Sequence, residues 1–194
     1  WSSDVCSSDL AKNLKIVYTP LHGTGLVPAT RVLKELGFEN VLVVPEQEKP
    51  DGDFPTVSYP NPESEAAFAL ALQYAKEQDA DLVLATDPDA DRVGIAVRDA
   101  EGTIRLLNGN QTASLLTYYL LTRWNELGKL NENTYMVKTI VTTELMRAMA
   151  DRFGIQMYDV LTGFKYIAEV IRNNEGKRTF IGGGEESYGF NVGE

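Results

Sequence analysis

The stretch LVLATDPDADRVGIAV, residues 82–97, places an acidic turn between two short apolar runs. Apolar runs of this length before and after a turn predict two buried strands. Within the turn, Asp87, Asp89 and Asp91 alternate with other residues, and Arg92 follows directly. Three carboxylates at this spacing repel one another unless a cation lies between them, and Mg²⁺ and Ca²⁺ both prefer carboxylate oxygens. Arg92 adds a cation suited to phosphate oxygens. The stretch therefore predicts a metal or phosphate site in preference to a plain solvated turn.

Two other types of acidic loop also contain alternating acids. An EF-hand loop starting at Asp87 needs Gly at its sixth position and Glu at its twelfth, where this chain has Arg92 and Arg98. The EF-hand is therefore excluded. A haloacid-dehalogenase-type phosphatase would have D-x-D-x-[TV] after a strand, and residues 89–93 fit with Asp89 as nucleophile and Asp91 as general acid. That alternative leaves Asp87 and Arg92 without a role, and it stays open here.

The glycine-rich segments of the chain are further candidate sites. His22, the only histidine, lies in the turn HGTG at residues 22–25, for which we favour a structural or domain-interface role over phosphate binding. Thr162 and Gly163 lie between an expected strand and an expected helix, where free backbone N–H groups could bind an anion or a hydroxyl group. An ordinary strand-to-helix turn is an equal alternative for that pair.

Glycines 182–184 predict a bend in the backbone. It would put Glu185 and Ser187 on one side of an extended loop, with Glu186 facing away. A carboxylate beside a hydroxyl suits two neighbouring sugar hydroxyls. A glycine-rich turn with surface acids is the simpler alternative.

Four segments, in this order along the chain, resemble the α-D-phosphohexomutase family, which comprises phosphoglucomutases and phosphomannomutases. They are YTPLHGTG at residues 18–25, TDPDADR at 86–92, TGFK at 162–165 and GEESYG at 184–189. The resemblance covers about residues 14–190 and is strongest to bacterial-type phosphoglucomutases.

The resemblance implies an isomerase of carbohydrate metabolism, an intramolecular phosphotransferase that interconverts hexose 1-phosphate and hexose 6-phosphate. The family works through a phosphoserine and a bisphosphorylated intermediate. It implies Mg²⁺ as the cofactor, held by Asp87, Asp89 and Asp91, with Arg92 as the catalytic contact to the transferring phosphoryl group.

The resemblance also implies a substrate-binding role for two loops of the second domain. Glu185 and Ser187 would bind the hexose hydroxyls of the sugar phosphate. Thr162 and Gly163 would border the same sugar.

Two loops of the family do not occur in this sequence. These are the serine loop, with its Ser-His-Asn-Pro core, and the phosphate-binding loop of the final domain, rich in Arg, Ser, Gly and Thr. We therefore expect a fragment with the second and most of the third domain of a four-domain enzyme, inactive by itself and lacking the first and fourth domains as partners. A non-catalytic sugar-phosphate-binding module is the remaining alternative.

The order of expected elements predicts an α/β fold with two consecutive α/β sandwich domains, whose mixed sheets are flanked by helices. Residues 1–10 are expected to be a non-native or disordered leader. The metal-loop domain would span residues 11–107, and the sugar-loop domain residues 108–194, truncated at its C-terminus. Asn61 and Pro62 predict a helix start, with Phe68, Leu72 and Ala75 facing the core.

Composition excludes several classes of protein. Of the 194 residues, 43% are hydrophobic and 24% charged, which is typical of a globular domain. A net charge of −10, from 28 acidic and 18 basic residues, argues against nucleic acid as a partner. No apolar run approaches the roughly 20 residues of a membrane-spanning helix. The single cysteine, Cys6, excludes an internal disulfide and suits the cytoplasm.

Overall fold

The computed structural model of the chain describes residues 13–193. The chain divides into two compact units, Trp1–Leu107 and Asn108–Glu194. The expected leader, residues 1–10, lies outside the described residues. None of the helices in the described part of the chain is long and apolar enough to cross a membrane.

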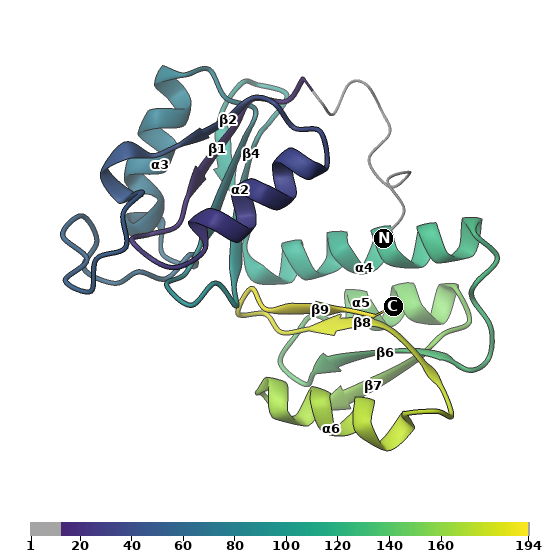
Figure 1. Ribbon diagram of the computed structural model, residues 1–194. Helices are drawn as coiled ribbons and strands as arrows, with labels where there is room; N and C mark the ends of the chain where they lie inside the picture. Colours follow the sequence, from purple (N-terminus) through teal and green to yellow (C-terminus); the bar gives the residue numbers. More distant parts are fainter. Residues whose placement is uncertain (1–12, 194) are drawn as a thin grey trace. The chain divides into compact units, whose positions relative to one another are not determined.

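The first unit is built on a five-stranded mixed sheet with the strand order β2-β1-β3-β4-β5 (Figure 1). Strand β1 pairs in parallel with both β2 and β3, whereas β4 and β5 run antiparallel to their neighbours. The strands are β1 (Ile16–Thr19), β2 (Val41–Val43), β3 (Leu82–Thr86), β4 (Val93–Arg98) and β5 (Ile104–Leu106). Alternate residues of β3 and β4 are buried, which is the burial pattern of strands with one face on a core.

Within the described part of the first unit, from residue 13 onward, two α-helices and a short 3₁₀-helix accompany the sheet. They are α2 (Leu26–Glu35), η2 (Pro45–Gln47) and α3 (Glu65–Glu77). Helix α3 buries Phe68 and Ala75, and Leu72 packs against the same core, as expected. Helix α2 covers the opposite side of the sheet without burying any of its own residues (Figure 1).

The expected start of α3 is wrong by three residues. Ser64 is the N-cap residue, and the helix begins at Glu65. Asn61 instead stabilises a separate turn, because its side chain accepts a hydrogen bond from the Glu63 N–H at 2.9 Å and its carbonyl accepts one from the Ser64 N–H at 3.0 Å. Asn side chains stabilise turns and helix starts through the same type of bond, so the two are hard to tell apart in a sequence.

The second unit has a four-stranded mixed sheet with the order β7-β6-β8-β9. Strand β6 pairs in parallel with β7 and β8, and β9 runs antiparallel to β8. The elements are α4 (Gly109–Glu126), β6 (Thr134–Thr139), α5 (Leu145–Arg152), β7 (Gln156–Val160), α6 (Phe164–Asn174), β8 (Thr179–Gly184) and β9 (Phe190–Val192). The α/β class and the two mixed sheets flanked by helices are thereby confirmed.

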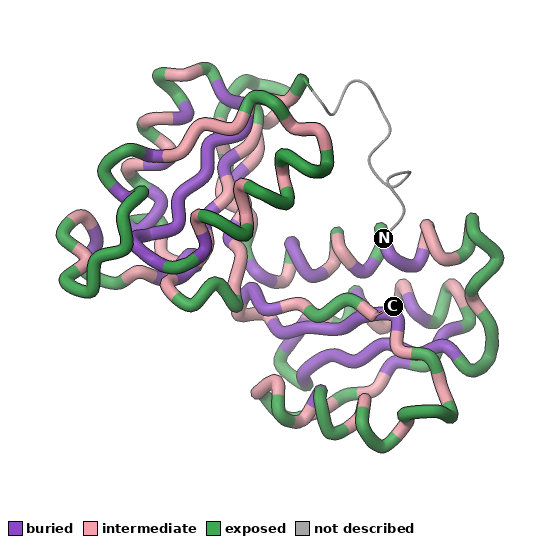
Figure 2. Tube along the Cα trace, viewed as in Figure 1, coloured by how far each residue is buried: buried purple, intermediate pink, exposed green. Residues whose placement is uncertain are grey.

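Helices cover both faces of the second sheet. Successive residues of β6 point to opposite faces, so Met136 joins a core with α4 and α5, whereas Val137 joins a second core with Ile167 of α6. Every residue of β6 is buried, which is typical of a central parallel strand (Figure 2). Asn108 caps α4 through a capping box with Gln111.

The expected extended loop after glycines 182–184 is also wrong. These glycines are the last residues of β8, and Gly184 pairs with Phe190 of β9, a strand that was not expected. The Glu185 N–H donates to the Gly189 carbonyl at 3.0 Å, so residues 185–189 form a tight turn between the two strands. Glycine fits here because a Cβ on Gly183 would lie 2.1 Å from the carbonyl oxygen of Val137 in β6.

Candidate functional site

The acidic turn joins β3 to the antiparallel strand β4. Its first residue, Asp87, accepts a hydrogen bond from the Ala90 N–H through its main-chain carbonyl at 3.0 Å. Ala90 has a φ of 60°, in the left-handed region that a non-glycine residue adopts at some cost. The sharp reversal brings the carboxylates on both sides of Ala90 together.

The side chains of Asp87, Asp89 and Asp91 converge as the sequence predicts. One carboxylate oxygen from each residue lies within 4.8 Å of the others. Asp87 is buried, whereas Asp89 and Asp91 are exposed. Burial and repulsion from Asp87 and Asp89 raise the pKa of the Asp91 carboxyl above its ordinary value. The three acids form a compact set of oxygen donors, open on one side.

Arg92 compensates the buried charge of Asp87. Its Nε donates to Asp87 Oδ2 at 2.7 Å and its main-chain N–H donates to Oδ1 at 3.1 Å. Arg92 Nε also lies 3.7 Å from Asp91 Oδ1. Burial alone would lower the pKa of the Arg92 guanidinium, but its hydrogen bond to Asp87 and the nearby acids raise it overall.

The glycine-rich turn at residues 22–25 packs directly against the acidic turn. It follows β1, the parallel neighbour of β3, so both loops leave the same edge of the sheet. Thr24 donates its N–H and its hydroxyl to the Pro88 carbonyl at 2.8 and 3.0 Å. A Cβ on Gly23 would lie 2.3 Å from Pro88 Cα. The ring of His22 contacts the Lys49 carbonyl and the Thr56 hydroxyl, which is a structural role.

The second candidate site lies where the parallel strands β6, β7 and β8 end. Glu185 is buried, and its Oε1 accepts a hydrogen bond from the Gly163 N–H at 2.6 Å. The Gly163 N–H is therefore not free, contrary to expectation. Thr162 is exposed beside it. Ser187 is half-buried, and its hydroxyl has no hydrogen-bond partner among residues 13–193. The structure brings Glu185, Gly163 and Ser187 to one edge of the sheet.

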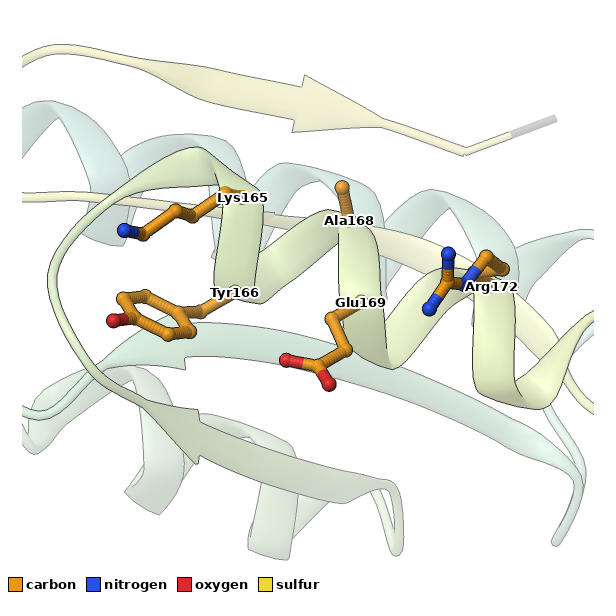
Figure 3. Close-up of a pocket in the computed structure, with 5 residues that line it drawn as sticks. All are labelled: Lys165, Tyr166, Ala168, Glu169 and Arg172. Carbon is orange, nitrogen blue, oxygen red and sulfur yellow. The ribbon is translucent and has the colours of Figure 1, made fainter.

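A shallow hollow along α6 is separate from these residues. It is lined by Lys165, Tyr166, Ala168, Glu169 and Arg172 (Figure 3). All five belong to one helix, and Lys165 Nζ lies 4.8 Å from the ring centroid of Tyr166. Lys165 thus covers the helix surface in the way that long side chains commonly do.

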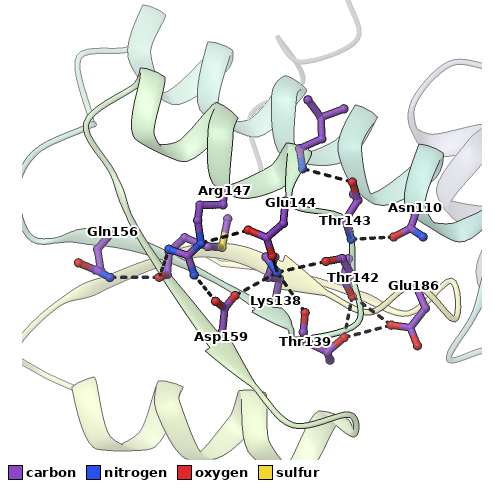
Figure 4. Close-up of polar contacts among 12 residues, drawn as sticks. Asn110, Lys138, Thr139, Thr142, Thr143, Glu144, Arg147, Gln156, Asp159 and Glu186 are labelled. Carbon is purple, nitrogen blue, oxygen red and sulfur yellow. Dashed lines mark hydrogen bonds and ion pairs between the residues drawn. The ribbon is translucent and has the colours of Figure 1, made fainter.

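Sequence reasoning missed a network of ion pairs around Lys138. This lysine is fully buried at the end of β6, and its Nζ lies 2.8 Å from Glu144 Oε1 and 3.1 Å from Asp159 Oδ1 (Figure 4). Arg147 pairs with both acids. A lysine in an apolar strand is a visible signal, but its partners depend on the register that places Lys138 opposite Asp159.

The two units match two domains of one enzyme family. The profile described as "Phosphoglucomutase/phosphomannomutase, alpha/beta/alpha domain II" matches residues 3–102, and the corresponding domain III profile matches residues 108–194. The chain therefore belongs to the phosphoglucomutase/phosphomannomutase family. The first match begins at residue 3 and so includes most of the segment expected as a leader.

Two bacterial phosphoglucomutases are 40% or more identical to this chain over the aligned residues. A phosphoglucomutase of Staphylococcus saprophyticus is 40% identical over 182 residues, which are 93% of this chain and 32% of the relative. A phosphoglucomutase of Staphylococcus epidermidis is 43% identical over 178 residues, 92% of this chain and 32% of the relative. This chain thus spans about a third of the length of these relatives.

Solved structures of the family share the fold. A phosphoglucomutase/phosphomannomutase family protein from Burkholderia thailandensis superposes with a TM-score of 0.72 at 22% identity, over 92% of this chain and 35% of that one. A putative phosphomannomutase from Thermus thermophilus superposes with a TM-score of 0.70 at 24% identity, over 98% of this chain and 41% of that one.

Proposed function

We propose that this chain supplies the metal-binding and sugar-recognition domains of a hexose-phosphate mutase. The whole enzyme would be an isomerase that moves a phosphoryl group between O1 and O6 of a hexose through a phosphoserine. The convergence of Asp87, Asp89 and Asp91 within 4.8 Å, in a unit that matches the family's domain II, is the observation that carries the proposal.

The acidic turn fits Mg²⁺ by the chemistry of its donors. Hard divalent cations prefer oxygen ligands. In this turn, each of the three carboxylates offers one oxygen atom, and these atoms lie close together. Asp87, Asp89 and Asp91 would hold the ion. When bound, Mg²⁺ would neutralise charge on a phosphoryl group. Arg92, fixed by Asp87 and still partly exposed, would contact an oxygen of the same group.

The turn after β8 supports recognition of a sugar. Glu185 uses Oε1 for the Gly163 N–H, which leaves Oε2 to accept a hydrogen bond from a sugar hydroxyl. The Ser187 hydroxyl can donate or accept. Ligands of open α/β sheets bind at the carboxyl ends of the strands, and these residues lie there in the second sheet. Thr162 would border the ligand.

Glucose phosphate is the proposed substrate, because the relatives with 40% identity or more are phosphoglucomutases. The phosphoserine would come from the family's first domain and a further phosphate contact from its fourth. A cytoplasmic location stays a prediction. The phosphatase alternative is disfavoured, because the family match covers the acidic turn as part of domain II.

A titration with Mg²⁺ tests the metal site. The substitution Asp89→Asn removes one charge and one strong oxygen donor without changing the side-chain size. We expect the Kd for Mg²⁺, measured by calorimetry on the 194-residue chain, to rise about tenfold or more. Asp53→Asn is the matched control, since Asp53 is an exposed acid outside the acidic turn. Equal affinities in both variants and the wild type would reject the proposal.

A further inference from the structure

The turn that carries Glu185 and Ser187 is fastened by the residue between them. Glu186 Oε2 lies 3.0 Å from the hydroxyl oxygens of both Thr139 and Thr142 (Figure 4). The two hydroxyl oxygens are 2.7 Å apart, and both threonines are buried. Two hydroxyls have two protons for these three contacts, so both donate to the carboxylate, or one donates to it and the other donates to its neighbour.

The loop that receives Glu186 is itself held firmly. Thr139 ends β6 and Thr142 lies in the loop to α5, where its carbonyl accepts a hydrogen bond from the buried Lys138 Nζ at 3.1 Å. The hydroxyl of Thr142 contacts the Glu186 carboxylate. The carboxylate therefore anchors the turn to a loop that cannot easily move, because the Lys138 charge is buried and paired.

The first turn of α4 also contacts the turn that carries Glu186. A Cβ on Gly109 would lie 1.5 Å from the main-chain oxygen of Glu186, so the two backbones are in direct contact. Asn110 Oδ1 accepts a hydrogen bond from the Thr143 N–H at 2.9 Å, which ties the same part of α4 to the loop after β6. The turn thus lies between two segments that are bonded to each other.

Glu185 and Glu186 reach different loops. Glu185 reaches Gly163, after β7, and Glu186 reaches the loop after β6. The loops that follow three parallel strands are therefore connected through two adjacent carboxylates. Glu185 and Ser187 would meet the ligand, whereas Glu186 points toward the threonines and contacts the protein alone.

We propose that Glu186 is a positioning residue, which holds Glu185 and Ser187 in place for a hexose phosphate through its hydrogen bonds to Thr139 and Thr142. This inference rests on the proposed function, because it assigns Glu186 a part in sugar recognition. A carboxylate that served only to satisfy two buried hydroxyls would affect the stability of the unit without affecting the geometry of the turn.

Amide hydrogen exchange followed by NMR tests the anchoring without any ligand. In Glu186→Ala, we expect the Glu185 and Gly163 amides, which report the closing of the turn and the Glu185 carboxylate, to exchange at least about tenfold faster. Amides in the centre of β6 should keep their rates, which separates local loosening from global unfolding. Unchanged exchange at Glu185 and Gly163 would overturn the inference.

Matched variants test whether hydrogen bonds to the Glu186 side chain hold the turn. Glu186→Gln keeps an oxygen that accepts hydrogen bonds and should restore the exchange rates to within about threefold of the wild type. Thr142→Val removes one donor and should loosen the same amides, with no additive effect when combined with Glu186→Ala. Glu169→Ala removes an exposed carboxylate on α6 and should change nothing. Failure of Gln to restore the turn, or full additivity, would contradict the hydrogen-bonding role.

A titration with glucose 1-phosphate, followed at the Ser187 amide, links the anchoring to recognition. The Kd should rise about tenfold in Glu186→Ala and return close to the wild-type value in Glu186→Gln. A Kd unaffected by Glu186→Ala would overturn the positioning role. Absence of binding by the wild-type chain would count against sugar recognition by this chain, and the exchange rates would then decide on the anchoring by Glu186 separately.

Discussion

The charged residues around Lys138, near the end of β6, differ in how far they are exposed to solvent. Lys138 is fully buried, whereas the side chains of its partners Asp159 and Glu144 remain 34% and 70% exposed. Removal of an acid therefore leaves a buried ammonium group with one partner fewer, which costs more than the loss of an exposed ion pair. The buried lysine makes its acids important for stability.

The pH dependence of unfolding tests this at Asp159. Burial would raise the pKa of the Asp159 carboxyl, but hydrogen bonds from Lys138 and Arg147 and their charges hold it below the ordinary 3.8. Its contribution is thus complete above pH 3.8 and is lost as the pH falls through the lower value of the folded state. Asp159→Asn should lower the free energy of unfolding by about 1–2 kcal/mol at pH 7, after allowance for exposure.

The difference between Asp159→Asn and the wild type should shrink as the pH falls below about 4. Trp124, packed against the core of the second unit, reports unfolding by fluorescence in a Trp1→Phe background. Asp151→Asn, an exposed acid on α5, is the control. A destabilisation that is constant with pH would exclude the ionised carboxylate as its cause.

At the scale of elements, the position of the acidic turn depends on the loop after β1. The two loops follow adjacent parallel strands, and the Pro88 main chain occupies the space where a side chain on residue 23 would lie. The order of the strands thus brings two segments together that are more than 60 residues apart in the chain.

Gly23→Ala should disturb the metal site without changing an acid. Its Cβ would meet backbone rather than a flexible side chain, so one of the two loops must shift. We expect the Kd for Mg²⁺ to rise roughly tenfold, as for changes in residues that support metal ligands. Gly52→Ala is the control, since a Cβ there has no neighbour within 4 Å. Wild-type affinity in Gly23→Ala would show that this contact does not orient the carboxylates.

For the whole molecule, the family's motifs that occur in this sequence, and those that do not, predict whether the chain is active. The sequence has the acidic turn and the GEESYG segment but no Ser-His-Asn-Pro sequence, the family's source of the phosphoserine. The 194-residue chain should therefore form no glucose 6-phosphate from glucose 1-phosphate with Mg²⁺ present. It should not hydrolyse p-nitrophenyl phosphate either. A coupled assay measures the formation of glucose 6-phosphate, with a full-length phosphoglucomutase as the positive control. Hydrolysis of p-nitrophenyl phosphate that is abolished by Asp89→Ala would support the phosphatase alternative.

The sequence by itself determined the class of fold, the family and the convergence of three acids. These features depend on local patterns: apolar runs that alternate with helical segments, and carboxylates only two residues apart in a hairpin turn. Asp87, Asp89 and Asp91 are so close in the chain that a single reversal suffices to bring them together.

Tertiary structure alone decided which distant groups meet. The Gly163 N–H bonds to Glu185, Glu186 bonds to Thr139 and Thr142, and Lys138 pairs with Asp159, over separations of 21 to 47 residues. Each contact follows from strand order and register, which are set by packing of side chains on both faces of the sheet and leave no trace in local sequence. The same cause made β9 and the turn before it unpredictable, because glycines 182–184 form a strand only where β6 lies beside them.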